Sequence, residues 1–180
     1  MPNAHRLAPA ARRYRVAVLG GTFDHLHAGH RALLEAAFLR ADRVKIGLTT
    51  DAFVRSERKP RLPRVESYGT RRRHLREFLR GRFGRRRWSI VALKDAWGGS
   101  VGPGADLLVL SEETRRATGP INAERRRRGL PPLRVFVLPQ MLAQDGRPIA
   151  SRRIRAGEID PEGHLVAAPG RRKRSSSTKA

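Results

Sequence analysis

The sequence of 180 residues contains no cysteine, which excludes disulfide bonds, thiolate metal sites and cysteine nucleophiles. Aromatic residues make up only 6% and are scattered, so the chain offers no obvious platform for stacking nucleic-acid bases. No apolar run approaches the roughly 20 residues that a membrane helix needs. The first 13 residues also lack the apolar stretch of a signal peptide. We therefore expect one domain in the cytoplasm, with no membrane contact.

Acidic residues are scarce as well, because 16 Asp and Glu stand against 39 Lys and Arg, for a net charge of +23. Lysine occurs only at positions 45, 59, 94, 173 and 179, so nearly all of these cations are arginine. Such a field attracts polyanions, whether nucleic acid, ATP or a phosphorylated substrate. The same composition also arises from genome bias or from life at high temperature. A basic nucleic-acid-binding protein is thus an alternative, although the sequence has no helix-turn-helix, zinc-binding or RNA-recognition signature.

The two ends differ in composition from the rest of the chain. Residues 1–13 lack hydrophobic periodicity and are interpreted as a flexible leader. Residues 169–180 are basic and serine-rich, and we expect a disordered tail whose only partner of note would be nucleic acid. The domain itself is expected to cover residues 14–168.

Short apolar runs alternate with helical patterns through this domain. The first run, YRVAVL, is typical of a buried parallel strand and is followed by a helix from Gly29. Strands are predicted at residues 14–19, 44–48, 88–93, 106–110 and 133–138, and further helices around residues 75–79 and 121–128. Strands that alternate with helices favour an α/β, Rossmann-like fold, in which a parallel five-stranded sheet carries helices on both faces. Ligands bind such sheets beyond the carboxyl ends of the strands.

The loop after the first predicted strand, GGTFDHLHAGH, contains candidate phosphate-binding residues. Glycines let a backbone approach a phosphate, and the following helix N-terminus offers free N–H groups. His27 and His30 are spaced to reach the same point near that terminus. Three histidines within six residues also leave a transition-metal site open as an alternative. The loop is neither a Walker A motif nor a G-x-G-x-x-G motif.

The segment His27-Ala28-Gly29-His30 matches the H-x-G-H signature of the nucleotidyltransferase superfamily, and Gly21-Thr22-Phe23-Asp24 is its usual partner. A second signature of that superfamily resembles residues 149–155, IASRRIR. Two of its hydroxyl positions, which normally lie near the ATP phosphates, are Ala150 and Arg152 here. The loss of a hydroxyl weakens such a contact, and Arg152 either replaces it with a charge or points to solvent. Further stretches, at residues 47–51, 95–98, 111–114, 121–130 and 157–160, resemble the phosphopantetheine adenylyltransferase family of the archaeal/eukaryotic type.

This resemblance implies transfer of AMP from ATP to 4′-phosphopantetheine, which gives dephospho-coenzyme A and pyrophosphate. An FMN adenylyltransferase shares the first signature and is the nearest alternative. Both reactants are strong anions, so catalysis requires orientation and charge stabilisation rather than a general base. Mg²⁺ is expected as the counter-ion of ATP, held mainly by phosphates and water, with no metal site in the protein itself.

The resemblance also implies roles for individual residues. His30 would donate to the α-phosphate and His27 to the leaving phosphates. Thr22 would hold the acceptor phosphate, with Lys59 and Arg71 as further acceptor contacts.

The remaining implied contacts are with the nucleotide. Gly21, Phe23 and Gly29 would line the nucleotide site. Arg125, Arg153 and Arg155 would neutralise the triphosphate. Ser151 is predicted either to contact ATP or to cap its helix.

Overall fold

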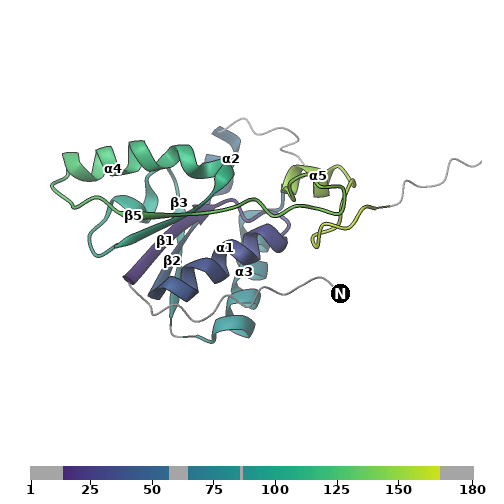
Figure 1. Ribbon diagram of the computed structural model, residues 1–180, viewed down its shortest axis with the longest axis horizontal. Coiled ribbons are helices and arrows are strands. Elements are labelled where there is room, and N and C mark those ends of the chain that lie inside the picture. Colours follow the sequence, from purple (N-terminus) through teal and green to yellow (C-terminus); the bar gives the residue numbers. More distant parts are fainter. Residues whose placement is uncertain (1–13, 57–64, 86, 167–180) are drawn as a thin grey trace, which may run out of the picture.

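The computed structural model describes residues 14–56, 65–85 and 87–166, and these form one twisted parallel sheet (Figure 1). Its strand order is β3-β2-β1-β4-β5, so the chain crosses over between β3 and β4. All four strand pairs are parallel. The strands are β1 (Tyr14–Gly21), β2 (Ala41–Thr49), β3 (Trp88–Leu93), β4 (Leu107–Ser111) and β5 (Arg134–Leu138).

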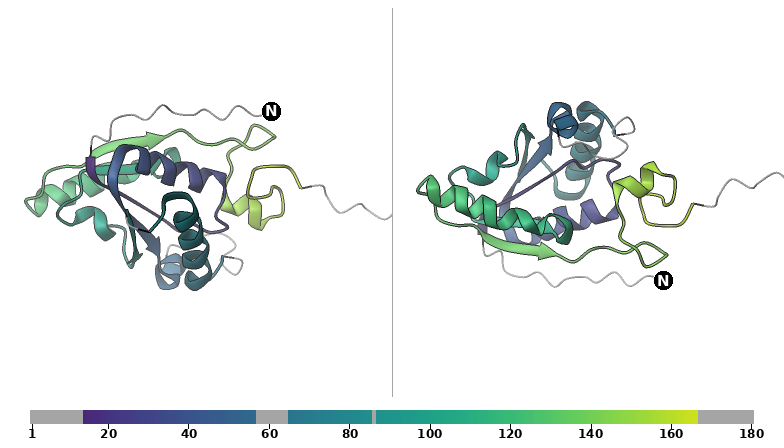
Figure 2. Two further views of the ribbon diagram at one scale, coloured as in Figure 1. Left: turned by 90° about the horizontal axis from the view of Figure 1, so that it is seen from below. Right: turned by 90° about the horizontal axis from the view of Figure 1, so that it is seen from above.

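Helices cover both faces of this sheet. Helices α1 (Ala28–Arg40) and α3 (Tyr68–Phe83) lie on one face and α4 (Thr118–Arg127) on the other, as the two views of Figure 2 show. Neighbouring strand residues alternate between the two layers: Ala17 and Leu19 of β1 pack under α1, whereas Val18 packs toward α4. Because helices cover both faces, β1 is apolar over residues 16–19 and β4 over residues 107–110, as expected for a parallel sheet, whereas β2 also contains Asp42, Arg43 and Lys45.

Helix α3 begins and ends at residues suited to those positions. Ser67 is its N-cap and accepts a hydrogen bond from the Thr70 amide at 3.2 Å. At the other end Gly84 adopts φ 72°, a left-handed conformation that only glycine adopts without strain. Between these ends Leu75 and Leu79, one turn apart, are fully buried against the sheet.

The predicted fold class is confirmed, and each predicted strand has a counterpart within three residues at either end. The helix expected to open at the second signature is α5 (Ser151–Arg155). Three short elements were not predicted: α2 (Asp51–Ser56) and the 3₁₀ segments Gly98–Val101 and Glu112–Ala117. The predicted leader, the whole of the predicted tail and Lys59 lie outside the described residues. Among the described residues, no helix is long and apolar enough to cross a membrane.

Candidate active site

A cavity of about 430 Å³ opens at the carboxyl ends of β1, β4 and β5, where the N-termini of α1 and α5 also point. The two signature segments, far apart in the sequence, meet in its wall. From the first come Gly21, Thr22, Phe23, Asp24, His27, Gly29 and His30, and from the second come Ile149, Ala150, Ser151, Arg152 and Arg155. The topology therefore assembles one site from two motifs, at the edge where doubly wound sheets bind their ligands.

The loop after β1 is held in an unusual backbone conformation. Phe23 and His25 have φ of 49° and 46°, in the left-handed region that residues other than glycine seldom adopt. Asp24 lies between them and is 1% exposed. Strained residues of this kind persist only where surrounding contacts fix them, and they gather at functional sites.

His27 and His30 stack on each other at the start of α1, with ring centroids 3.7 Å apart. His27 is the N-cap, and its Nδ1 accepts from the His30 amide at 3.4 Å, which leaves Nε2–H as the donor of the neutral ring. A Cβ on Gly29 would lie 3.2 Å from the His27 ring, so this glycine allows the ring to pack closely.

Both imidazoles are neutral at pH 7 in the absence of ligand. Burial, reinforced by the nearby Arg31, lowers the pKa of His27 to about 4. Burial and the neighbouring His27 lower the pKa of His30 well below its ordinary value. The Nδ1 atom of His30 is buried without a hydrogen-bond partner. The pair therefore offers neutral donors and a buried polar atom at a place suited to an anion.

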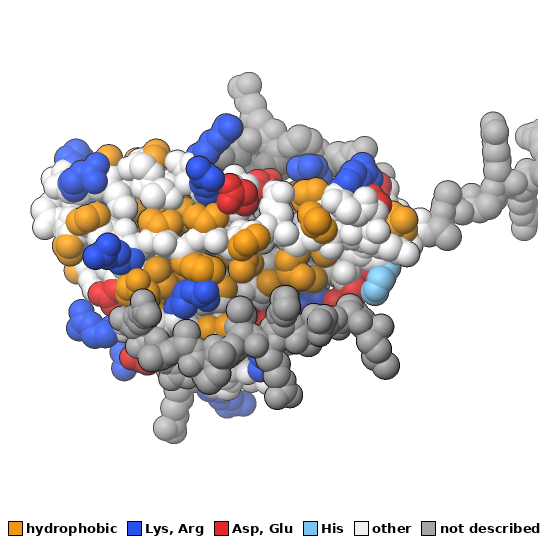
Figure 3. Space-filling view, viewed as in Figure 1, with side chains coloured by type: hydrophobic (Ala, Val, Ile, Leu, Met, Phe, Trp, Pro, Cys, Tyr) orange, Lys and Arg blue, Asp and Glu red, His pale blue; other side chains and the backbone are white. Residues whose placement is uncertain are grey.

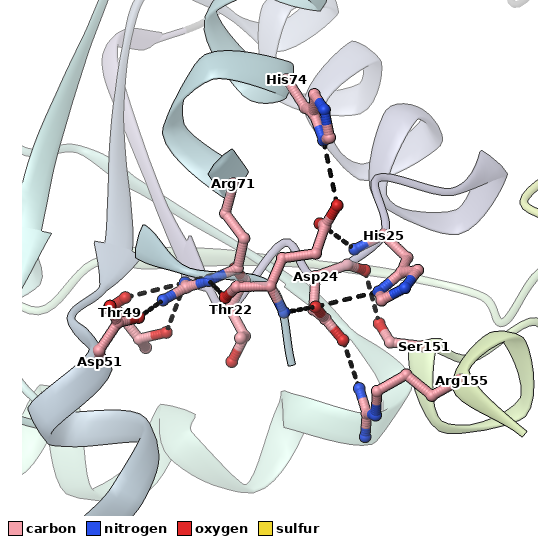
Figure 4. Close-up of polar contacts among 10 residues, drawn as sticks. Thr22, Asp24, His25, Thr49, Asp51, Arg71, His74, Ser151 and Arg155 are labelled. Carbon is pink, nitrogen blue, oxygen red and sulfur yellow. Dashed lines mark hydrogen bonds and ion pairs between the residues drawn. The ribbon is translucent and has the colours of Figure 1, made fainter. Parts of the chain in front are cut away.

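Asp24 joins the first signature to the second (Figure 4). Its carboxylate forms an ion pair with Arg155, whose side chain is 7% exposed, and its carbonyl oxygen accepts from Ser151 Oγ at 2.9 Å. Ala150, rather than Ser151, is the N-cap of α5, so the capping alternative for Ser151 is wrong. Ser151 and Arg155 both line the cavity, and both are anchored to Asp24.

Arg71 is completely buried and supports the loop from behind. Its guanidinium donates to the carbonyls of Thr22 at 2.8 Å and Thr49 at 2.9 Å, and pairs with Asp51 at 2.8 Å. It is absent from the cavity wall. The predicted contact with the acceptor is therefore corrected: the donors of Arg71 are engaged by the protein, and its position fixes Thr22 instead.

Two arginines predicted to contact ATP also lie elsewhere. Arg125 is 1% exposed beneath the opposite face of the sheet, where it donates to the carbonyls of Ser100 at 2.7 Å and Gly102 at 2.9 Å. Arg153 is 5% exposed and pairs with Asp145 and Glu158 at 2.6 and 3.0 Å. Neither lines the cavity, because each is used to join neighbouring loops, so both predictions are corrected.

The cavity wall also contains residues that the sequence-based site did not include. Arg152 lines it from α5, and the chain after β4 and β5 supplies Ser111, Glu113, Thr114, Leu138, Pro139, Gln140 and Met141. Their place beyond the carboxyl ends of two predicted strands was the available signal.

A second cavity of about 180 Å³ adjoins the first and shares Gly20, Gly21, Thr49 and Thr114 with it. Its lining is largely apolar and includes Phe53, Leu93 and Trp97. Leu93 lies so close to Gly47 that a Cβ there would be 2.7 Å from its side chain. Glycine at this position therefore lets Leu93 pack against the floor of the sheet.

Residues 18–157 match the cytidylyltransferase-like family model. The chain is 44% identical over 155 residues to the phosphopantetheine adenylyltransferase of Methanopyrus kandleri, covering 86% of this chain and 96% of that protein. It is 38% identical to the enzyme of the same name from Methanothermobacter thermautotrophicus, covering 86% and 92%.

Among solved structures, a protein of unknown function from Archaeoglobus fulgidus superimposes with a TM-score of 0.60 at 26% identity, covering 70% of this chain and 99% of that one. Fold, site and relatives agree: the chain belongs to the cytidylyltransferase-like family of nucleotidyltransferases, together with the archaeal phosphopantetheine adenylyltransferases.

Proposed function

We propose that this protein transfers the adenylyl group of ATP to 4′-phosphopantetheine, giving dephospho-coenzyme A and pyrophosphate. The observation that carries the proposal is the convergence of both signatures on one cavity, with neutral histidines and arginines in its wall. The archaeal relatives that bear this name match the chain over most of its length.

In this reaction an oxygen of the acceptor phosphate forms a bond to the α-phosphorus, and the bond from that phosphorus to the bridging oxygen breaks. No side chain has to remove a proton, because the attacking phosphate is already an anion. The task is to hold two anions in line and to stabilise the charge that develops between them. A wall rich in donors fits this task.

The histidines and the loop would act on the reacting phosphates. Nε2–H of His27 is free of the capping bond and would donate to the leaving phosphates. His30 would donate to the α-phosphate, and an anion there would raise the pKa of both rings. Thr22, fixed by Arg71 through its carbonyl, would hold the acceptor phosphate, and Lys59 remains a predicted contact.

Arg152 and Arg155 would neutralise the triphosphate from α5. Mg²⁺ bound to ATP would supply further neutralisation. Of the described carboxylates in the cavity wall, Asp24 is paired with Arg155 and Glu113 is exposed, which fits an ion carried in by the nucleotide rather than one caged by the protein.

The adjoining apolar cavity would hold the uncharged arm of the acceptor. It shares Gly21 and Thr49 with the phosphate site, so a single molecule can occupy both with its phosphate at the junction. Its apolar wall favours an acceptor with a mostly uncharged chain over a flat, polar ring system.

The test measures pyrophosphate release from ATP and Mg²⁺ with 4′-phosphopantetheine, FMN or nicotinamide mononucleotide as the acceptor. We expect release with 4′-phosphopantetheine and a loss of about 10²–10³-fold in kcat for His30→Ala. The control His164→Ala changes a histidine that is 70% exposed and should retain activity. Pyrophosphate release only with FMN or nicotinamide mononucleotide would show that the acceptor is a different molecule. No release with any of the three would overturn the proposal.

A further inference from the structure

A second polar cluster lies beside the cavity, where the loop after β1 meets the segment that leads into α3. It consists of Asp24, His25 and Glu66, each of which offers one ligand atom within 4.8 Å of the others. The cluster is largely enclosed, because the side chains of Asp24, His25 and Glu66 are 2%, 29% and 18% exposed. Neither His25 nor Glu66 lines the cavity, so the cluster is separate from the proposed phosphate contacts.

The Nδ1 atom of His25 is the ligand atom that this residue offers. It lies 3.1 Å from Asp24 Oδ1, is buried and makes no hydrogen bond. A buried polar atom without a partner is destabilising, and a bound ion would remove that cost. Two ligands of one tetrahedral zinc ion, each at about 2.0–2.2 Å from it, stand about 3.3–3.6 Å apart. The 3.1 Å between His25 Nδ1 and Asp24 Oδ1 is slightly shorter, so the two atoms already lie close to that arrangement.

Hydrogen bonds hold the three side chains in place, and Figure 4 shows Asp24 and His25 side by side. Asp24 Oδ1 accepts from the Glu66 amide at 2.9 Å, and Glu66 Oε2 accepts from the His25 amide at 2.8 Å. His74 Nδ1 lies 3.3 Å from Glu66 Oε1 on the outer side. Supporting contacts of this kind orient metal ligands in known sites. His25 has a left-handed backbone, at φ 46°, and its ring lies beside Asp24.

We propose that Asp24, His25 and Glu66 bind one divalent transition-metal ion of the zinc type, with water completing its coordination. One imidazole nitrogen and two carboxylate oxygens suit zinc or cobalt, whereas magnesium and calcium prefer oxygen alone. This ion is distinct from the Mg²⁺ that accompanies ATP. It would tie the loop after β1 to the entry of α3 and so hold Asp24, the partner of Arg155, in position.

The test uses untagged, full-length protein freed of metal by EDTA and dialysis, and it does not depend on adenylyl transfer. Titration with Co²⁺ should give the visible absorption of a four-coordinate ion at one equivalent per chain. Zn²⁺ should displace Co²⁺ and raise the melting temperature, since it binds the folded state. Wild-type protein that binds neither ion would overturn the proposal.

Variants place the ion within the molecule. His25→Asn should weaken binding at least about tenfold, and asparagine tolerates the left-handed backbone, so the fold should be kept. Glu66→Gln, which still accepts from the His25 amide, should weaken it similarly. His164→Asn is the matched control, since this histidine also contacts an aspartate, Asp160, and it should bind normally. Binding that survives in His25→Asn but is lost in His27→Asn would move the ion to the signature histidines and overturn the assignment.

Discussion

His30 is partly buried, and this burial, together with His27 and Arg31, makes its ring costly to charge and lowers its pKa. A positive charge on this ring would have no compensating partner until an anion arrives. The ring therefore remains a neutral donor in the empty site, and phosphate binding supplies the charge that its protonated form would need. This arrangement favours the bound anion without leaving an unpaired cation in the free protein.

The lowered pKa of His30 predicts how stability depends on pH. The unfolded chain takes up a proton near pH 6.5, whereas the folded chain does so only at much lower pH. The neutral ring therefore makes its full contribution to the free energy of unfolding above pH 6.5. This contribution is lost as the pH falls below that value. Urea denaturation in EDTA between pH 7.5 and 5 should show a fall for the wild type and a smaller fall for His30→Asn. Parallel curves would contradict this prediction, and His27 accounts for the slope that remains.

At the scale of elements, buried arginines join segments that the hydrophobic core does not reach. Arg125 connects α4 with the loop before β4, Arg71 connects α3 with the ends of β1 and β2, and Arg153 connects α5 with the loop before it. Each guanidinium donates to main-chain carbonyls, which a short, irregular loop would otherwise leave unpaired. These contacts stabilise loops whose apolar content is low.

Two glutamine substitutions separate this structural role from ligand binding. Arg125→Gln should lower the free energy of unfolding by at least about 2 kcal/mol, because buried carbonyls lose their donors, and should leave the KM for ATP unchanged. Arg155→Gln, in the cavity wall, should raise that KM. Denaturant titration and steady-state kinetics on both variants check the pair. A raised KM in Arg125→Gln would restore the earlier interpretation of this residue.

Hydrophobic patterning was sufficient for the large elements of the fold and weak for the short ones. Each strand contains a short apolar stretch, such as residues 16–19 in β1 and 107–110 in β4, and α1 and α3 have apolar residues at helical spacing. Helix α2 buries only Val54, and Glu112–Ala117 buries no residue, so neither leaves a periodic signal. The signature motifs located the site, and their residues Thr22, His27, His30, Ser151 and Arg155 do line the cavity.

The sequence did not show which arginine side chains lie in the cavity wall and which are used elsewhere in the fold. Arg125, Arg153 and Arg155 lie in similarly basic segments, yet only Arg155 reaches the cavity. The partners of Arg125 are main-chain carbonyls, which every residue has, so no sequence pattern marks them. A buried guanidinium and an exposed one are therefore indistinguishable until the backbone is placed.

For the whole molecule, the positive charge is spread rather than gathered at the site. Figure 3 shows Lys and Arg side chains at several separate places on one face. Elsewhere Arg72, Arg76 and Arg80, one turn apart on α3, line two further surface hollows. Such a field raises the local concentration of anions, including both proposed substrates, over the whole surface.

Salt should therefore weaken substrate capture more than it slows the reaction. Raising KCl from about 50 to 500 mM should increase the KM for ATP several-fold while kcat changes little, because screening acts on exposed charges. The triple substitution of Arg72, Arg76 and Arg80 by glutamine should flatten this dependence without abolishing activity. Steady-state kinetics at matched Mg²⁺ check both, and an unchanged KM across this range would contradict the effect of the field.

The long-range anchoring of Asp24 has a consequence for how the protein is made. Ser151 and Arg155 follow Asp24 by 127 and 131 residues in the sequence. They are therefore synthesised long after β1 and β2, which lie between residues 14 and 49. At about 5–20 residues per second, the ribosome needs on the order of ten seconds to reach the second signature. Throughout that time the nascent chain can form most of its sheet but has no complete site. Chains released before α5 is synthesised would thus be partly folded and inactive. The site is complete only once translation has passed α5.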